Sequence, residues 1–564
     1  MKKGLVGVLL AFAVVLVFAP NGWNSFVRFD DMDYVAKNPH IEHGLNVRLA
    51  KWAFLPTGYA DNWHPLTWIS HAADVSIADA LGLDGRNPNA KYGVWAKLDS
   101  SFARFAHWVN ILFHAANAVL LWLLMLRLLS VKGDEPADVR LSILAALCAA
   151  FWAIHPLRVE VVAWVSERKE LLSVFFMLLA LHCYIGGFRF SRFCSLVSFG
   201  LALLAKPVAV TLPALLLAWE WVAERRSLRE AIGRTFVYFL LSFVTCVFTM
   251  GAQTTARLVG RLMTPFNHMM CVIMSPAVYA WQTLVPYGLT MDYPDPHLST
   301  CWPFAAAGLV LLAAMVAVCV WWLVRPNRWN RLGALAVAWC YVELLPMIGI
   351  VRVGPEPHSD RYTYWIGCGA VVVLFWVASR LVRFWRPYER KFFTGIAIAL
   401  VVYAALTVRQ SAVWKDTISL FSDAVEKTHS DDLTISLMDE YCLTGGQDGG
   451  KKAEKLIRGS PSNTPAARAG LALYLARISY VREEPGQYAE ARLLAEGALE
   501  EDPYCCYAHA ALGILHARGK NYAKAVEHVS KALECGYENL MLADDLRKWR
   551  EILAKEKGCG DVQR

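Results

Sequence analysis

Three aspartates lie within four residues of one another, directly after an apolar N-terminal segment. Asp30, Asp31 and Asp33 belong to the stretch RFDDMDYVAKNPHI, residues 28–41. A carboxylate can act as a general base that takes a proton from a hydroxyl group, and two adjacent carboxylates can hold Mg²⁺ or Mn²⁺. Aspartate also caps helices and turns, which is an equally good interpretation for Asp33. We predict Asp30 as a base and Asp31 as its orienting partner or a second contact to the acceptor.

Basic residues that could bind a phosphate recur in three other motifs. Lys206 precedes Pro207 in LLAKPVAVTLP, at a predicted helix break where a cation and freed N–H groups can meet a phosphate. Its alternative role is that of a lysine extended towards the headgroup region. Arg168 and Arg361 can clamp a phosphate through two N–H groups, or pair with carboxylates and hold loops together. We predict a phosphate-binding role for all three cations.

Polar and aromatic residues surround these candidates in the motifs NWHPLTWISHAADV, HPLRVEVVAWVSERKELL and SDRYTYW. His64 and His155 are expected to brace a cavity, although a histidine could also assist proton transfer. A structural role is slightly favoured for Glu160. The residues predicted to support the site or line its cavity are His64, His155, Arg158, Glu160, Asp360, Tyr362 and Tyr364.

The composition places these motifs in a polytopic membrane protein. Of 564 residues, 56% are hydrophobic and only 18% are charged, which is too apolar for an ordinary soluble enzyme. A span needs about 20 mostly apolar residues. The first apolar segment is expected to be a retained helix, because Pro20 disfavours signal-peptide cleavage. Eleven spans are predicted, near 4–20, 107–128, 141–155, 171–187, 194–205, 208–222, 235–252, 304–324, 333–351, 364–382 and 393–408.

Basic loops predict the orientation of these spans, because short loops rich in Lys and Arg stay cytoplasmic. Every second loop is basic, beginning with Lys2 and Lys3. The N-terminus is therefore expected in the cytoplasm, and the acidic stretch and the other motifs on the outer face. The net charge of +8 follows from this topology without a nucleic-acid partner. Segment 266–288 would break the alternation, so we expect it to lie along the outer interface or to dip in and return.

The chain changes character after about residue 409 and becomes rich in Ala, Glu, Lys and Leu. Tyr488, Ala491, Ala498 and Leu499 recur as Tyr522, Ala525, Ala532 and Leu533, at the 34-residue period of tetratricopeptide repeats. Small residues such as Ala511 and Gly513 would let paired helices approach closely. We predict an all-α protein with a membrane domain at 1–408, including a large outer loop at 21–105, and a helical-repeat domain at 409–564.

The cysteines give little support for a metal centre. The 14 cysteines contain no Cys-x-x-Cys pair, so a zinc site is not expected.

Glu343 stands out as an acid within a predicted span, and such a position indicates a functional residue by default. Its distance from the outer motifs makes a packing hydrogen bond the favoured interpretation.

Cations and carboxylates gathered at the level of the outer headgroups suggest one reaction. The cations could bind a lipid phosphate while a carboxylate takes a proton from an incoming hydroxyl. Transfer of a sugar from a polyprenyl phosphate needs these two elements. The phosphate is already a competent leaving group, so no cofactor is required, although a divalent metal stays an open alternative. A single displacement would invert the sugar's configuration.

The motifs FDDMDYVAKNPHI, NWHPLTWISHAADV, HPLRVEVVAWVSERKELLS, AKPVAVTLP and SDRYTYW, followed by repeats, resemble one family. They are similar to the transmembrane and tetratricopeptide-repeat O-mannosyltransferases and their bacterial homologues. The resemblance implies a GT-C fold glycosyltransferase that moves a sugar, typically mannose, from a polyprenyl-phosphate donor to Ser or Thr hydroxyls of a protein acceptor. The family's acidic pair in the first outer loop maps onto Asp30 and Asp31.

This resemblance implies a bacterial inner-membrane enzyme embedded in the lipid bilayer, with its repeat domain in the periplasm, where it could hold the acceptor. Two other classes of function stay open. A transporter of lipid-linked sugars would place charge near the midplane and show repeats in its membrane halves. A non-catalytic scaffold that anchors the repeats for envelope assembly would not need its outer-face charges.

Overall fold

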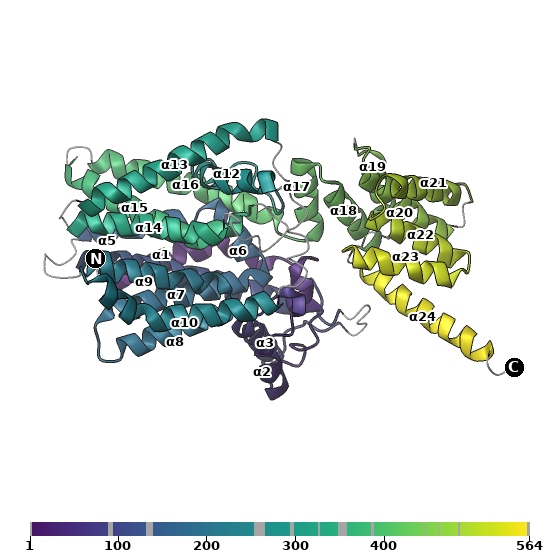
Figure 1. Cartoon of the computed structure of the whole chain (residues 1–564), viewed down its shortest axis with the longest axis horizontal. Helices are drawn as coiled ribbons and strands as arrows, with labels where there is room; N and C mark the ends of the chain where they lie inside the picture. Colours follow the sequence, from purple (N-terminus) through teal and green to yellow (C-terminus); the bar gives the residue numbers. More distant parts are fainter. Residues whose placement is uncertain are drawn as a thin grey trace. The chain divides into compact units, whose positions relative to one another are not determined.

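A computed structural model shows a helical protein (Figure 1). The chain forms two compact units, one ending at Thr417 and the other beginning at Ile418. The described residues contain no β-strand, only an isolated bridge between Arg86 and Ala96. The structure describes residues 3–87, 94–130, 139–252, 265–293, 298–324, 328–347, 358–384, 389–444, 446–460, 462–482, 485–537 and 539–560.

The long helices of the first unit are apolar. Within the described residues, seven are long and apolar enough to cross a membrane: Gly4–Trp23, Ser101–Leu128, Val165–Gly186, Leu228–Ala252, Trp302–Val324, Asp360–Leu381 and Lys391–Val413. The pair Val139–Ala153 and Pro156–Ala163, bent by 62°, makes an eighth if it counts as one span. Shorter apolar helices cover Ser191–Ala205, Pro207–Ala223 and Met269–Leu284. The predicted membrane character is confirmed, whereas the count of eleven spans stays a prediction.

The elements of the first unit follow one another from α1 to α16. In chain order they are α1 (Lys3–Phe18), η1 (Ala19–Trp23), η2 (Met32–Ala36), α2 (Val47–Ala53), η3 (Tyr59–Asp61), α3 (Pro65–Ala80), α4 (Ser101–Ser130), α5 (Val139–Ala153), η5 (Pro156–Arg158), α6 (Val159–Ala163), η6 (Val165–Glu167), α7 (Arg168–Gly186), α8 (Ser191–Ala205), η7 (Pro207–Thr211), α9 (Leu212–Ala218), η8 (Trp219–Ala223), α10 (Leu228–Ala252), α12 (Pro265–Leu284), α13 (Leu298–Val324), α14 (Arg328–Met347), η9 (Asp360–Tyr362), α15 (Thr363–Phe384) and α16 (Glu389–Val413).

A polar stripe on the apolar helix α4 explains how the chain can break beside it. Asn110, His114 and Asn117 lie on one face, at the i, i+4 and i+7 positions. Asn110 donates to the carbonyls of Val162 and Trp164. Asn117 donates to the carbonyl of Leu171, and Nε2 of His114 bonds the carbonyl of Ala153. Asn110 and His114 thereby satisfy carbonyl groups at the breaks after α5 and α6, as irregular backbone in an apolar region requires, whereas Asn117 bonds a carbonyl within α7.

The predicted loop at 21–105 is folded rather than extended. It contains the short elements η2, α2, η3 and α3. Its aromatic residues pack together, with His40 stacked on Trp52 at 4.0 Å between ring centroids and Tyr34 at 4.5 Å from Trp68. Thr67 on α3 donates to the carbonyl of Ala205, which ties this loop to the end of α8.

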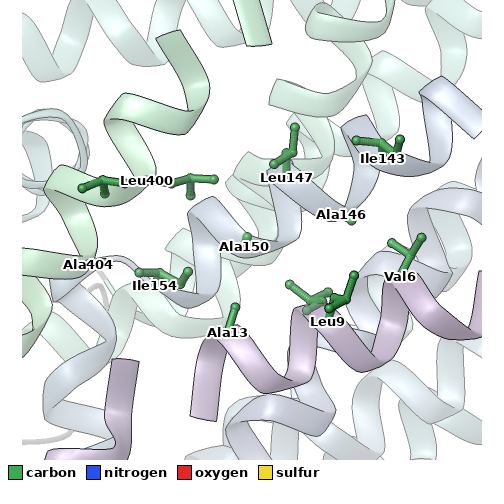
Figure 2. A pocket seen from close by; sticks show the side chains of 12 residues that line it. Val6, Leu9, Ala13, Ile143, Ala146, Leu147, Ala150, Ile154, Leu400 and Ala404 are labelled. Carbon is green, nitrogen blue, oxygen red and sulfur yellow. The ribbon is translucent and has the colours of Figure 1, made fainter. Parts of the chain in front are cut away.

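An apolar cavity of about 380 Å³ opens between α1, α5 and α16 (Figure 2). Figure 2 shows Leu9 and Ala13 of α1 facing Ala150 of α5 and Ile154 just after it, with Leu400 and Ala404 of α16 beside them. No charged side chain lines it. It therefore offers shape and apolar surface but no groups for acid–base chemistry.

The second unit is built from helices that pack in sequence. They are α17 (Thr417–Thr428), which starts at the boundary, α18 (Asp431–Thr444), α19 (Gly446–Arg458), α20 (Pro465–Arg482), α21 (Pro485–Glu501), α22 (Cys506–Arg518), α23 (Tyr522–Glu534) and α24 (Leu540–Gly560).

The positions predicted to repeat in the second unit lie on α21 and α23, where Ala491, Ala498, Ala525 and Ala532 are all fully buried. A Cβ added at Gly513 would come within 2.4 Å of a methyl group of Val529, so α22 and α23 approach closely there. The predicted domain boundary at residue 408 lies inside α16, because Thr407 and Ser411 are buried and the helix continues to Val413.

Candidate functional site

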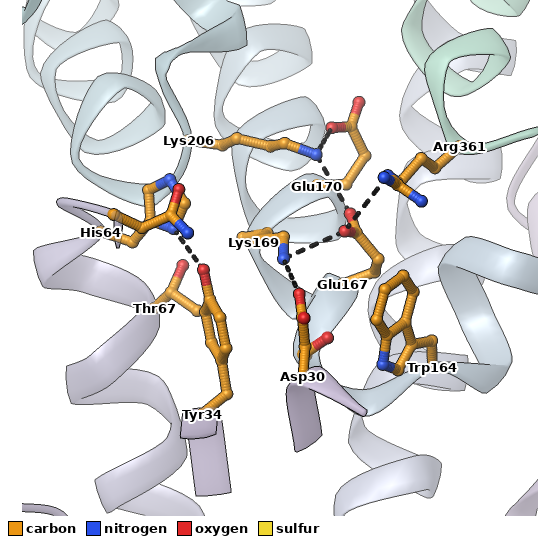
Figure 3. Close-up of polar contacts among 12 residues, drawn as sticks. Asp30, Tyr34, His64, Thr67, Trp164, Glu167, Lys169, Glu170, Lys206 and Arg361 are labelled. Atoms are coloured by element: carbon orange, nitrogen blue, oxygen red, sulfur yellow. Dashed lines mark hydrogen bonds and ion pairs between the residues drawn. The ribbon is translucent and has the colours of Figure 1, made fainter. Parts of the chain in front are cut away.

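The candidate site is a network of charged side chains at the start of α7 (Figure 3). Its acids lie just before η2 and on α6, η6 and α7. Its cations lie on α7, at the break after α8 and on η9. We call this the polar network: Asp30, Glu160, Glu167, Lys169, Glu170, Lys206 and Arg361.

Glu167 lies at the centre of the polar network. Its carboxylate is 3.1 Å from Nζ of Lys169, 3.1 Å from Nζ of Lys206 and 3.8 Å from Nε of Arg361. Figure 3 shows the three cations converging on this acid from different sides. Glu167 is 1% exposed, so a ligand does not reach it. Its role is to hold the three cations in place.

Lys169 joins Asp30 to this centre. Its ammonium lies 3.3 Å from Oδ2 of Asp30 and 4.4 Å from the ring centroid of Tyr34. Asp30, Lys206 and Arg361, which are far apart in sequence, are therefore linked through Lys169 and Glu167. The structure thus brings together the predicted base and two of the three predicted phosphate-binding residues.

The accessible groups of the polar network differ from its buried ones. The side chain of Asp30 is 38% exposed, that of Lys206 16% and that of Arg361 14%. The carboxylates that pair with the two cations are only 1–3% exposed. The surface offered to a ligand therefore combines one carboxylate with two cations.

Asp31 is fully buried, in contrast to its neighbour Asp30. Its carboxylate accepts hydrogen bonds from the backbone N–H groups of Val27, at 3.1 Å, and Ser166, at 2.8 Å. Burial raises the pKa of Asp31 to about 7, against the opposing effect of these two hydrogen bonds. Asp31 ties the acidic stretch to the turn before Glu167 and does not reach the accessible surface, so a second contact to an acceptor is not its role.

Lys206 lies in extended backbone, with φ −155° and ψ 136°, between α8 and η7. This is the helix break that Pro207 predicts. The ammonium pairs with Glu170 at 2.9 Å as well as with Glu167. The break therefore directs a lysine into the polar network rather than towards the end of the helix.

Arg361 is held by Glu160. Oε1 of Glu160 lies 2.6 Å from Nη1 of Arg361, and Oε2 accepts from the Arg361 backbone N–H at 3.0 Å. The hydroxyl of Ser359 also donates to Glu160, at 2.9 Å. The guanidinium lies 5.5 Å from the ring centroid of Trp164. Glu160 thus fixes the SDRY segment, in agreement with the structural role favoured for it.

Arg168 does not belong to the polar network, because its side chain points away from the accessible surface. It is fully buried, pairs with Asp74 at 3.0 Å and donates to Asn110, Ser70 and the carbonyl of Ala106. A guanidinium with these partners has no face left for a phosphate. The prediction of a phosphate-binding role for Arg168 is therefore replaced by a packing role.

The remaining predicted site residues brace the surrounding elements. Arg158 donates to the carbonyl and the hydroxyl of Thr363, at 2.7 and 2.9 Å, and joins η5 to α15. His155 accepts from the N–H of Leu157 and bonds the carbonyl of Thr283. Arg158 therefore holds the residue that follows the SDRY segment, whereas His155 joins the turn after α5 to the end of α12.

The tyrosines of the SDRYTYW motif are packing residues. Tyr364 is buried, and its hydroxyl bonds His114 at 2.8 Å and Asn117 at 3.1 Å. Tyr362 packs against the buried pair Tyr279 and Leu344. Asp360 accepts a hydrogen bond of 2.7 Å from the hydroxyl of Tyr293.

His64 bonds the hydroxyl of Tyr34 at 3.0 Å beside the polar network. Burial lowers the pKa of His64 well below its usual range, and the nearby Lys169 acts in the same direction. The imidazole is therefore neutral. It orients Tyr34, whose ring faces the ammonium of Lys169.

Sequence reasoning did not select Glu167, Lys169 and Glu170 as site residues. All three occur in the quoted motif SERKELL, and the signal that could have found them is their spacing. Glu167 and Glu170 are three residues apart and share a face once α7 begins. Within the described residues, no group of three or more His, Cys, Asp or Glu side chains could hold a metal ion.

Fold and site together define a helical protein, apolar enough to span a membrane, with an accessible carboxylate and two accessible cations in one network. Neither the protein-family models nor the curated proteins compared with the sequence give a match. The assignment of a function therefore depends on the chemistry of these residues.

Proposed function

We propose that the protein is a membrane glycosyltransferase of the GT-C type, which moves mannose or another hexose from a polyprenyl-phosphate donor to Ser or Thr hydroxyls of proteins. One observation carries this proposal. The groups of the polar network that a ligand can reach are Asp30, Lys206 and Arg361, an acid and two cations, whereas the groups that hold them are buried. Proton removal and phosphate stabilisation are the two demands of this reaction.

In the proposed reaction, the acceptor hydroxyl oxygen attacks the anomeric carbon of the sugar as the bond from that carbon to the phosphate oxygen breaks. The electron pair of the broken bond leaves with the polyprenyl phosphate. Asp30 takes the hydroxyl proton and, because its side chain is 38% exposed, returns it to water. Attack opposite the leaving group inverts the anomeric configuration.

Lys206 and Arg361 bind the phosphate in this proposal. Their charge stabilises the developing phosphate anion, and the planar guanidinium can donate two parallel hydrogen bonds. Glu167 and Glu160 keep both cations in position before the donor arrives. Such preorganisation avoids the free-energy cost of assembling the charges during the reaction.

The proposed topology has eleven spans, a cytoplasmic N-terminus and the polar network on the periplasmic face of a bacterial inner membrane. The bent pair α5–α6 and the short helices α8 and α9 would then be spans of unusual form. The second unit would be a periplasmic tetratricopeptide solenoid that holds the protein acceptor. The buried alanines at equivalent positions of α21 and α23 support this part.

The test in cells compares glycopeptides of envelope proteins made with the wild-type protein, with Asp30→Asn and with Asp84→Asn. Asp84 is a matched control, since it lies in the same predicted loop, is exposed and pairs with Lys97 at 2.9 Å. We expect a hexose-sized mass increment with the wild type and Asp84→Asn, and its loss with Asp30→Asn. Unchanged glycosylation with a correctly inserted Asp30→Asn would support the scaffold alternative instead.

A further inference from the structure

A second charged cluster lies at the opposite end of α7 from the polar network. Arg192, Arg226 and Arg234 converge on Glu220, at 2.6, 2.7 and 3.5 Å. The hydroxyl of Tyr184 also donates to Glu220, at 2.7 Å. We call the three arginines the arginine cluster. Since α7 rises by about 1.5 Å per residue, the cluster and the polar network are roughly 25 Å apart along the helix.

The local fold explains why the arginines meet. They come from the start of α8, the turn after η8 and the second turn of α10, which all lie at one end of their helices. Arg225 adopts a left-handed conformation, with φ 56°, and this turn carries Arg226 back over Glu220. Arg192 is further held by the ring of Tyr184, 3.6 Å from its guanidinium carbon.

The charge of the arginine cluster is not balanced by its acid. One carboxylate that is 1% exposed faces three guanidinium groups that are 37–41% exposed. The nearby acid Glu230 accepts from the backbone N–H of Ser227 at 3.1 Å. The two oxygens of Glu220 can accept from all three guanidinium groups and from Tyr184, but its single negative charge neutralises only one of the three positive charges.

The surroundings of the arginine cluster match a membrane interface. Exposed aromatic residues lie within a few positions of Arg192 and Glu220 in the chain, namely Phe190 just before α8, Phe193 on α8 and Trp221 on η8. The apolar helices α7, α8 and α10 lead away from this end. Aromatic side chains collect at the headgroup level of membranes, and basic pockets between membrane helices bind anionic headgroups.

We infer that the arginine cluster binds the phosphate group of an anionic lipid headgroup. The unbalanced charge supplies the attraction, and the planar guanidinium forks fit phosphate oxygens. Exposed apolar side chains of α8 and α10, such as Val197 and Phe236, offer a surface to acyl chains. Free phosphate offers the same chemistry to the arginines but has no acyl chains to use this surface. This inference does not depend on the proposed glycosyltransferase activity.

The test titrates the full-length protein in neutral detergent with dioleoylphosphatidylglycerol and counts bound lipid by native mass spectrometry. The double variant Arg226→Gln/Arg234→Gln is compared with the control Arg86→Gln/Arg104→Gln, whose arginines are somewhat more exposed and each pair with one acid. We expect about fivefold weaker binding per arginine removed, or about 25-fold for the first variant. The control should bind like the wild type.

Removing two arginines leaves Glu220 buried with fewer partners, so a second variant guards against misfolding. Glu220→Gln removes the competing carboxylate and should bind phosphatidylglycerol about fivefold more tightly. Unchanged affinity in both variants, or equal binding of phosphatidylcholine by the wild type, would overturn the inference. If inorganic phosphate alone displaces the lipid completely at millimolar concentration, the lipid assignment is also overturned.

Discussion

The contrast between Asp30 and Asp31 leads to a prediction about pH. Asp31 is fully buried, and its pKa is raised to about 7 from an unfolded value of 3.8. Between these values the folded protein keeps a proton that the unfolded chain releases. The contribution of Asp31 to stability is therefore fully present below about pH 4 and is lost as the pH rises towards 7.

The magnitude follows from the shift. A change of one pKa unit corresponds to about 1.4 kcal/mol, so about three units amount to roughly 4 kcal/mol. The variant Asp31→Asn does not titrate. Its amide has one oxygen and can accept from only one of the two N–H groups, of Val27 or of Ser166, which lowers the stability of the variant by about 1 kcal/mol. This cost is the same at both pH values and cancels. The window from pH 5 to pH 7.5 covers about two of the three units, so the variant should gain on the wild type by about 2.5 kcal/mol.

The assay is thermal unfolding of the purified protein in detergent at both pH values. For a unit of about 400 residues, about 2.5 kcal/mol corresponds to a shift of roughly 3 °C in the melting temperature. Other titrating groups are common to both proteins and cancel in the difference. Asp84→Asn, at an exposed carboxylate, should give no such change. Parallel pH profiles for Asp31→Asn and the wild type would refute the placement of Asp31 in a dry environment.

Two further predictions separate packing from phosphate binding. Arg168→Met strands Asp74 without its partner and should lower stability by about 3–5 kcal/mol, while activity per folded molecule changes less than about threefold; a stable but inactive variant would contradict the packing role. Arg361→Lys keeps the charge but loses the planar fork. It should raise the KM for the lipid donor about tenfold, or about 1.4 kcal/mol, with little change in kcat, and an unchanged KM would count against phosphate binding at Arg361.

Much of the fold could be predicted from patterns that depend on local chemistry. Apolar runs predict the long helices, and Pro207 predicts the break that leaves Lys206 in extended backbone. The span count was harder to predict, because α5 and α6 are bent at Pro156 and α8 is short. Hydropathy measures composition along the chain, whereas a break depends on partners such as Asn110, which are distant in sequence.

The sequence indicated which short segments contribute to the site, but not which of two adjacent residues does so. Asp30 and Asp31 are adjacent, yet one is accessible and the other is buried under two backbone N–H groups. Arg168 and Lys169 are also adjacent, and the start of α7 turns the first into the core and the second into the polar network. Successive helical residues differ by about 100° around the axis. Sequence alone did not specify where α7 begins, so it could not choose between them.

The most direct test of the proposed function uses the purified protein in liposomes with a polyprenyl-phosphate-linked hexose and a Ser/Thr peptide. Transfer is measured for the wild type, Asp30→Asn and Asp84→Asn, together with donor binding in the same samples. If Asp30 is the base, Asp30→Asn should slow transfer about 10²–10⁴-fold while donor binding stays within about twofold and Asp84→Asn behaves like the wild type. Transfer by Asp30→Asn within a few fold of the wild-type rate would contradict the assignment of Asp30 as the base.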